Sequence, residues 1–99
     1  MNRNNGGIKN ISALLSKEND INKIISFFYE ILTESEIETL SKRWRILEML
    51  NKNMTQREIA KELKVSLCKV TRGAQILKNE KSIINEYLKK GGDDGNKKI

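Results

Sequence analysis

The chain has 99 residues, and its 19 Lys and Arg outnumber its 13 Asp and Glu to give a formal net charge of +6. This length suits one domain, and the basic balance suits a polyanionic partner, either nucleic acid or an acidic membrane face. No His is present and Cys68 is the only cysteine, so the usual general base, His- or Cys-cluster metal sites and an internal disulfide are excluded.

The N-terminal segment MNRNNGG is polar and glycine-rich, so we expect residues 1–7 to form a flexible tail. It lacks the apolar stretch of a signal peptide, and the apolar runs elsewhere in the chain are far shorter than a membrane span. The single cysteine also points to a reducing compartment. The sequence therefore predicts a cytoplasmic protein without a membrane partner.

Residues 8–90 are predicted to form one all-α domain of six short helices, because apolar residues recur at helical spacing and proline is absent. The third helix opens with TESE, in which Thr33 can cap the helix and Glu36 can reach back to form a capping box. Each of the first three helices carries one apolar stripe. The stripe residues are Ile8, Ile11, Leu14 and Leu15, then Ile21, Ile24, Ile25, Phe28 and Leu32, then Ile37, Leu40, Trp44 and Leu47.

The fourth and fifth helices lie within residues 55–78 and are joined by the short segment KVS. Thr55 and Glu58 form a second predicted capping box, and Ser66 is predicted to cap the fifth helix. A small residue, Ala60, lies where the two helices must cross closely, which is typical of a helix-turn-helix. In that motif the second helix enters the major groove of DNA. The residues expected to face inward are Ile59, Ala60, Leu63, Val65, Val70 and Leu77.

Side chains in the first turns of such a second helix normally meet base edges, and basic residues around them contact phosphates. The predicted DNA-binding residues are Gln56, Arg57, Lys61, Ser66, Leu67, Cys68, Lys69, Thr71 and Lys78. A solvated basic face is the alternative, but caps, crossing residue, apolar spacing and charge together favour DNA. For Cys68, a small residue facing the groove is favoured over a redox switch. Lys64 occupies the turn position where glycine is usual, so we expect the turn to depart slightly from the standard one.

The sixth helix is predicted to begin at a cap formed by Asn79 and to end at Gly91, and residues 91–99 are predicted to form a second flexible tail. The two helices before the central trio and the one after it are amphipathic. A three-helix core cannot cover all of their apolar faces, so we expect a second subunit to cover them.

The segment LTESEIETLSKRWRILEMLNKNMTQREIAKELKV, followed by KVTRGAQILK, resembles the tryptophan repressor family from about Leu32 to Lys78. The pieces LT, RxRI, QRE and TRG occur in the order of that family. The resemblance implies an all-helical, intertwined homodimer that binds double-stranded operator DNA as a sequence-specific transcriptional repressor. This family is itself one of those in which the second helix is known to enter the groove, so the groove placement is not independent of the resemblance.

The resemblance also implies L-tryptophan as a corepressor, wedged between the helix-turn-helix and the core. Arg72 can hold a carboxylate by two parallel hydrogen bonds, and Arg43 can lie on an indole face in a contact worth about 0.5–2 kcal/mol. The predicted effector-binding residues are Thr33, Arg43, Arg72, Gly73 and Ile76. Other readings stay open: Arg72 could contact phosphate, Arg43 could be a surface residue, and Gly73 could allow two helices to pack closely.

Two departures from the family support an alternative function. Ile76 stands where the family places a small hydroxyl residue, and Glu30 stands where an apolar residue is expected. The alternative is a helix-turn-helix regulator that binds DNA constitutively or with a different effector, and a helical adaptor with an incidental basic face is a further possibility. We do not expect an enzyme, because Glu36 and Glu58 are assigned to caps and no nucleophile–base pair can be assembled. No catalytic residue, metal site or further cofactor is predicted.

Overall fold

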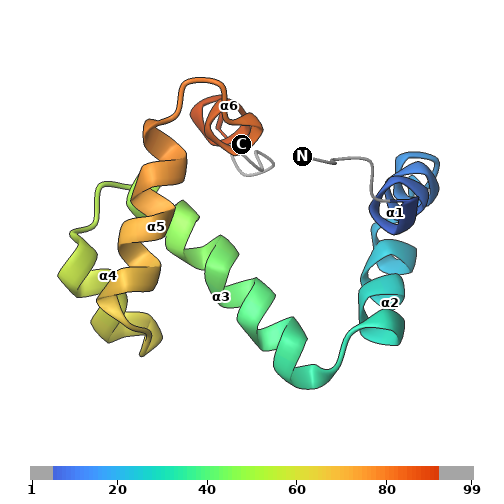
Figure 1. Cartoon of the computed structure of the whole chain (residues 1–99), viewed down its shortest axis with the longest axis horizontal. Coiled ribbons are helices and arrows are strands. Elements are labelled where there is room, and N and C mark those ends of the chain that lie inside the picture. Colours follow the sequence, from blue (N-terminus) through green and yellow to red (C-terminus); the bar gives the residue numbers. More distant parts are fainter. Residues whose placement is uncertain (1–5, 92–99) are drawn as a thin grey trace. The chain divides into compact units, whose positions relative to one another are not determined.

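The computed structural model describes residues 6–91, and within them the chain is all-α, as predicted (Figure 1). The helices are α1 (Gly6–Ser16), α2 (Ile21–Ile31), α3 (Glu34–Asn51), α4 (Gln56–Leu63), α5 (Leu67–Lys78) and α6 (Ile83–Lys89). α1 begins inside the predicted N-terminal tail, and the rest of both predicted tails, residues 1–5 and 92–99, lies outside the described residues. The chain divides into two compact units, one up to Ile37 and one from Glu38, with the boundary inside α3.

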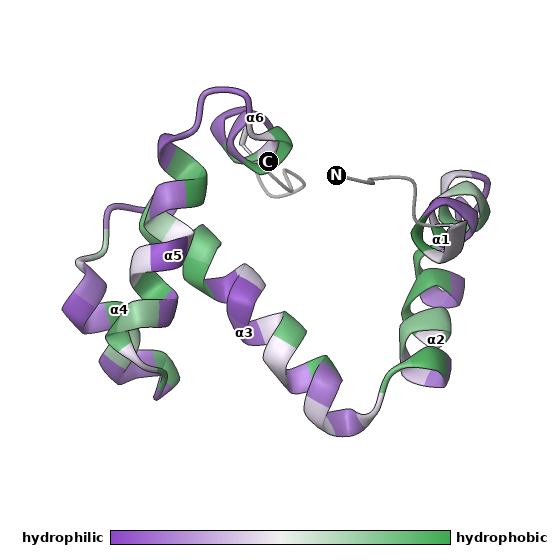
Figure 2. Cartoon of the chain, viewed as in Figure 1, coloured by the Kyte–Doolittle hydropathy of each residue, from purple (hydrophilic) through white to green (hydrophobic). Residues whose placement is uncertain are grey.

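The first unit contains α1 and α2, and neither helix has a buried residue. The carboxylate of Asp20 accepts a hydrogen bond from the backbone N–H of Asn22 at 2.9 Å and so caps the start of α2. Apolar residues are nevertheless numerous on both helices, as the hydropathy colours of the ribbon show (Figure 2). Ile21, Ile25 and Tyr29 are spaced four residues apart on α2, and their exposed fractions are 67%, 47% and 62%. This spacing places them on one face, and the unit does not cover that face by itself.

The start of α3 has the capping box that the sequence predicts. The Thr33 backbone N–H donates to a carboxylate oxygen of Glu36 at 2.9 Å, and the Glu36 N–H donates to the Thr33 hydroxyl at 3.1 Å. Two backbone donors that an isolated helix end leaves unpaired are thereby satisfied.

The second unit is built around a small core between α3, α4 and α5. Ile46, Met49, Ile59 and Val70 form its buried cluster, and Ile59 and Val70 are completely inaccessible to solvent. Five partly buried residues pack against this cluster: Leu50, Met54, Ala60, Leu63 and Val65. The inward positions predicted for Ile59 and Val70 are confirmed, and the core holds the helix-turn-helix against the second half of α3.

The connection from α5 to α6 differs from the prediction. Asn79 does not cap α6; it ends α5, and its side-chain oxygen accepts a hydrogen bond from the Lys81 N–H at 2.9 Å. Ser82 caps α6 instead by accepting from the Asn85 N–H at 3.1 Å. Both residues are good cap formers, so the length of α5, which the local sequence does not reveal, decides which of them begins the next helix.

α6 is held to α5 by a buried amide. The side-chain nitrogen of Asn85 donates to the backbone carbonyls of Leu77 at 2.9 Å and Asn79 at 3.2 Å. The Asn85 residue is only 7% exposed. The last carbonyls of a helix have no partner within the helix, so the end of α5 offers acceptors to this amide. The two hydrogen bonds in turn satisfy the buried amide of Asn85.

Candidate nucleic-acid interface and effector pocket

The corner between α4 and α5 has a closely defined backbone. Lys64 follows α4 with φ 57° and ψ 48°, and the next residue, Val65, donates its N–H to the carbonyl of Ala60 at 3.1 Å. Ser66 then caps α5 by accepting from the Lys69 N–H at 3.3 Å. Lys64 thus adopts the left-handed conformation that glycine would adopt more easily, in place of the altered turn expected from the sequence.

α5 presents one buried side and one exposed side. Val70 and Gly73 are its buried residues, and they face the core. The exposed side includes Leu67, with 47% of its surface accessible, and the free cysteine Cys68. Of the predicted DNA-binding residues, Gln56 is half-buried and the others are exposed: Arg57, Lys61, Ser66, Leu67, Cys68, Lys69, Thr71 and Lys78.

A hydrogen bond between two side chains links α4 to α5 at this surface. The Thr71 hydroxyl donates to the side-chain oxygen of Gln56 at 2.9 Å. The two residues are 15 positions apart, so periodicity, which detects neighbours three or four positions apart, cannot reveal the pair. Sequence reasoning named both residues but treated them as separate DNA contacts.

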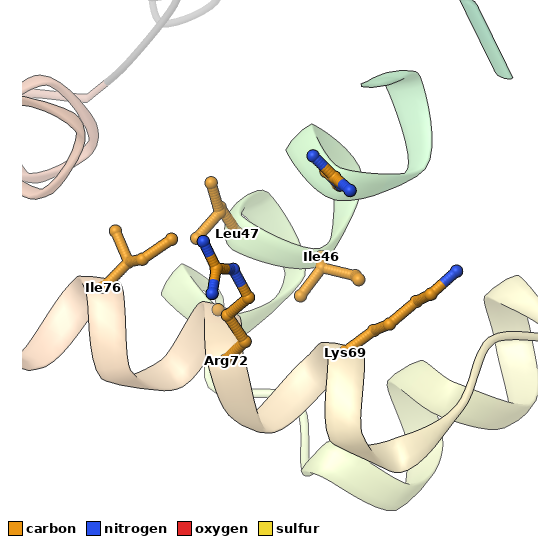
Figure 3. Close-up of a pocket in the computed structure, with 7 residues that line it drawn as sticks. Ile46, Leu47, Lys69, Arg72 and Ile76 are labelled. Carbon is orange, nitrogen blue, oxygen red and sulfur yellow. The ribbon is translucent and has the colours of Figure 1, made fainter. Parts of the chain in front are cut away.

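A hollow of about 100 Å³ lies between α3 and α5 in the second unit (Figure 3). Its lining residues are Arg43, Ile46, Leu47, Lys69, Arg72, Gly73 and Ile76. Four predicted effector residues, Arg43, Arg72, Gly73 and Ile76, therefore lie around one pocket. The remaining three lining residues were not assigned to it, although helical spacing could have found them, since Ile46 and Leu47 follow Arg43 by three and four positions and Lys69 precedes Arg72 by three.

Thr33, the fifth predicted effector residue, belongs to the first unit. Its hydroxyl accepts from the Glu36 N–H at 3.1 Å, and its carbonyl accepts from the Ile37 N–H at 2.9 Å. Both oxygen atoms therefore already serve the start of α3, and the role of Thr33 toward an effector stays a prediction.

Gly73 lies where the backbone of α5 faces side chains of α3. A Cβ atom at this position would be 2.8 Å from Cγ2 of Ile46, 3.3 Å from Cδ1 of Leu50 and 3.5 Å from Cδ2 of Leu47. The space in front of Gly73 is therefore occupied by α3 side chains. The same residue also lines the pocket, so the close packing of two helices and the shape of the hollow depend on one glycine.

The charged side chains around the pocket are all cations: Arg43, Lys69 and Arg72. Within residues 6–91, the ion pairs are Lys42–Glu38, Arg45–Glu48 and Lys90–Glu86, and none of them includes a pocket residue. The apolar lining and the cations suit a ligand with an apolar body and a carboxylate.

Trp44, which was predicted on the apolar stripe of α3, is half-buried and contacts α6. Its ring centroid is 6.2 Å from that of Tyr87, with the ring planes inclined at 50°. The pocket lining does not include this indole. The described part of the chain also contains no cluster of three or more Cys, Asp or Glu side chains suited to a metal ion, and none of its helices is long and apolar enough to span a membrane.

Comparison of the sequence with known proteins finds relatives that are described as repressors. A family model described as "Trp repressor protein" matches residues 7–91. A "Trp operon repressor homolog" of Xylella fastidiosa is 49% identical over 61 residues, which are 61% of this chain and 64% of the relative, so the match spans less than two thirds of that relative's length. A protein of the same description from Chlamydia caviae is 34% identical over 87 residues, covering 87% of this chain and 86% of the relative. No solved structure matched the chain.

Proposed function

Because the chain belongs to the Trp repressor family, we propose that it is a DNA-binding transcriptional repressor whose DNA-binding head is formed by α4 and α5. The observation that carries the proposal is the helix-turn-helix itself, in which α5 turns Val70 toward the core and leaves the other residues of its first turn exposed. The family consists of transcription regulators and not of enzymes. A repressor works in the compartment that holds its operator, so the proposal includes the predicted cytoplasmic location.

In the proposed complex, the exposed side of α5 enters the major groove while α4 crosses the DNA backbone. Ser66, Leu67 and Lys69 begin α5 and would lie near base edges. The small, exposed Cys68 would let the helix approach the groove closely. Arg57, Lys61 and Lys78 are exposed basic residues around this surface and would contact phosphates, which set the position of the helix without reading the base sequence.

We further propose that the active form is a homodimer. Neither α1 nor α2 has a buried residue within its unit, and Ile83 and Tyr87 of α6 are 78% and 47% exposed. A second copy of the chain is the partner that would cover such faces in every molecule. Two recognition helices in a dimer must lie about 34–36 Å apart to enter successive major grooves, so the expected operator is palindromic.

The pocket between α3 and α5 is the proposed effector site, and the family name makes L-tryptophan the first candidate. Arg72 would bind the carboxylate, and Arg43 would lie on the ring. A ligand here would act as a wedge that sets the tilt of α5 against α3. Such coupling is typically worth about 1–3 kcal/mol, and by linkage operator DNA must tighten effector binding by the same factor.

One experiment tests DNA binding and gating together. The full chain is used to select from a duplex DNA library with and without L-tryptophan at about 1 mM, a concentration at which even a site of weak affinity would be half occupied. The selected site is then titrated at several salt concentrations. Three basic residues per protomer give six phosphate contacts in a dimer, so log K should fall against log salt with a slope of about −5. The absence of selection, or of any salt dependence, would contradict the repressor function and favour a helical adaptor.

The second candidate function is a regulator that binds DNA constitutively or with a different effector. It is favoured by Ile76, which gives the pocket wall an aliphatic side chain without a hydrogen-bonding group for the ammonium of an amino acid. Glu30, exposed on α2, was the other sequence feature in its favour. If the selected site binds equally well with and without L-tryptophan, this second function replaces the first.

A further inference from the structure

The hydrogen bond from Thr71 to Gln56 has a chemical consequence for the DNA surface. A glutamine amide has one oxygen, which accepts hydrogen bonds, and one NH2 group, which donates two. The Gln56 oxygen accepts from the Thr71 hydroxyl at 2.9 Å. This bond uses the amide oxygen and leaves the donors of the NH2 group unused.

Gln56 is the first residue of α4, the helix that crosses the DNA backbone in a helix-turn-helix. Phosphate oxygens are acceptors only, so a Gln56 that offered its carbonyl would repel them and one that offers its NH2 would bind them. Thr71 is exposed on α5, and its hydroxyl hydrogen is already donated to Gln56. With the amide oxygen engaged by this hydroxyl, the group that Gln56 can still offer to a phosphate is its NH2 donor.

Resting on the proposed function, we propose that Thr71 is a positioning residue that holds the Gln56 amide for a DNA phosphate and does not read a base edge. The bound hydroxyl and amide form a relay from α5 through Gln56 to the backbone of the duplex. Holding a flexible side chain in its binding conformation before the complex forms lowers the entropy cost of binding. The relay also fixes the position of α4 relative to α5 on the DNA.

The test is a double-mutant cycle on duplex DNA carrying the selected operator. Thr71→Val removes the hydroxyl with little change of shape, and Gln56→Ala removes the amide. Each is expected to weaken binding about tenfold, the order of one hydrogen bond to a charged group. The double variant should bind like Gln56→Ala alone, because Thr71 acts only through Gln56. Thr71→Ser keeps the hydroxyl and should bind within about twofold of the original chain.

Two readouts separate positioning from base reading and from a general loss of structure. Thr71→Val should leave the preferred operator sequence unchanged, and it should leave the salt slope unchanged because a neutral amide releases no counterion. In the DNA-free chain, the NMR signals of the Gln56 NH2 group should shift in Thr71→Val and stay in place in Thr71→Ser. Thr39→Val, at another exposed helical threonine, is the matched control and should leave DNA affinity unchanged.

The outcomes are distinct from those that test the proposed function. A relaxed base preference in Thr71→Val, or a further loss when Thr71→Val is added to Gln56→Ala, would overturn the positioning role while DNA binding stands. Unchanged Gln56 NH2 signals in Thr71→Val would overturn it as well. If the original chain binds no duplex DNA, the repressor function and the positioning role both fall.

Discussion

Gly73 is the residue on which the packing of α5 against α3 depends. Replacement by Ala would bring a Cβ atom to 2.8 Å from Cγ2 of Ile46. This methyl carbon is attached directly to the branched Cβ of a residue that is only 2% exposed, so it cannot move aside by a rotamer change. Overpacking of this kind costs about 1–3 kcal/mol, whereas Ala gains about 1 kcal/mol of helix propensity over Gly. The steric cost therefore exceeds the gain in helix propensity.

We therefore expect Gly73→Ala to lower the free energy of unfolding by about 1 kcal/mol, measured by urea denaturation followed by circular dichroism. Gly6→Ala is the matched control, because a Cβ atom at that position would have no neighbour within 4 Å. It should leave stability unchanged or slightly increased. A more stable Gly73→Ala chain would mean that α3 yields to the added methyl group, and the steric reading of this glycine would be wrong.

Lys64 shows that the backbone of the turn is not determined by the preference of the residue in it. A lysine in the left-handed region costs roughly 1 kcal/mol, yet φ at this residue is 57°. The bond from the Val65 N–H to the Ala60 carbonyl at 3.1 Å and the packing of Val65 against the core hold the corner in place. The geometry of the motif therefore prevails over the preference of a single residue, which is why the altered turn expected from the sequence does not form.

At the scale of the helices, the buried Asn85 is the tie between α6 and α5. Asn85→Leu keeps a similar volume but removes the donor to the carbonyls of Leu77 and Asn79. Loss of two hydrogen bonds made by a residue that is 7% exposed costs about 1–3 kcal/mol, so we expect a loss of stability in that range and faster amide hydrogen exchange in α6. Asn51→Leu is the control, since the Asn51 residue is exposed and its amide donates over a longer distance of 3.4 Å to Leu88.

Equal stabilities for Asn85→Leu and Asn51→Leu would contradict this role of the buried amide. Stabilisation by Asn85→Leu would show that added apolar burial outweighs the two lost hydrogen bonds. Urea denaturation of both variants, with exchange measured residue by residue, distinguishes loss of the α6 contact from loss of the whole fold.

The starts of α3, α4 and α5 were predictable because their signals are local, whereas the starts of α1 and α6 differ from the prediction. The capping boxes at Thr33 and Thr55 and the cap at Ser66 are each formed within four residues, and each is present. The buried positions of α3 were less predictable. The stripe through Leu40 and Trp44 leaves Leu40 46% exposed, while Ile46 and Met49 are buried. Ile46 and Met49 form the core with residues of α4 and α5, and neither lies on the single stripe that periodicity identified.

The candidate site was predictable to a similar extent. The family resemblance brought together Arg43, Arg72 and Ile76, which line one pocket. The link between Gln56 and Thr71 could not be predicted, because it joins two helices across a turn and depends on their crossing angle. Local patterns thus identify which residues belong to the surface, and the tertiary structure determines which of them act together.

At the scale of the whole molecule, the exposed stripe of α2 leads to a prediction about assembly. Ile21, Ile25 and Tyr29 are each at least 47% exposed, and a contiguous apolar face of this kind is typical of an interface. In a symmetric dimer every substitution occurs twice, and burying one isoleucine side chain contributes about 1.5–3 kcal/mol. A glutamate at the centre of the stripe would also bring an unpaired charge into the interface.

We expect the original chain to sediment at twice its 11.4 kDa mass at micromolar concentration, and Ile25→Glu to dissociate or unfold. Lys23→Glu is the matched control: it lies on the same helix, is exposed and changes the charge further, so it should remain dimeric. Sedimentation equilibrium gives the mass and circular dichroism gives the helix content. Because one head covers a single major groove, Ile25→Glu should also lose the preference for a palindromic site. A monomeric original chain, or an Ile25→Glu chain that stays dimeric, would require a different role for the α2 face.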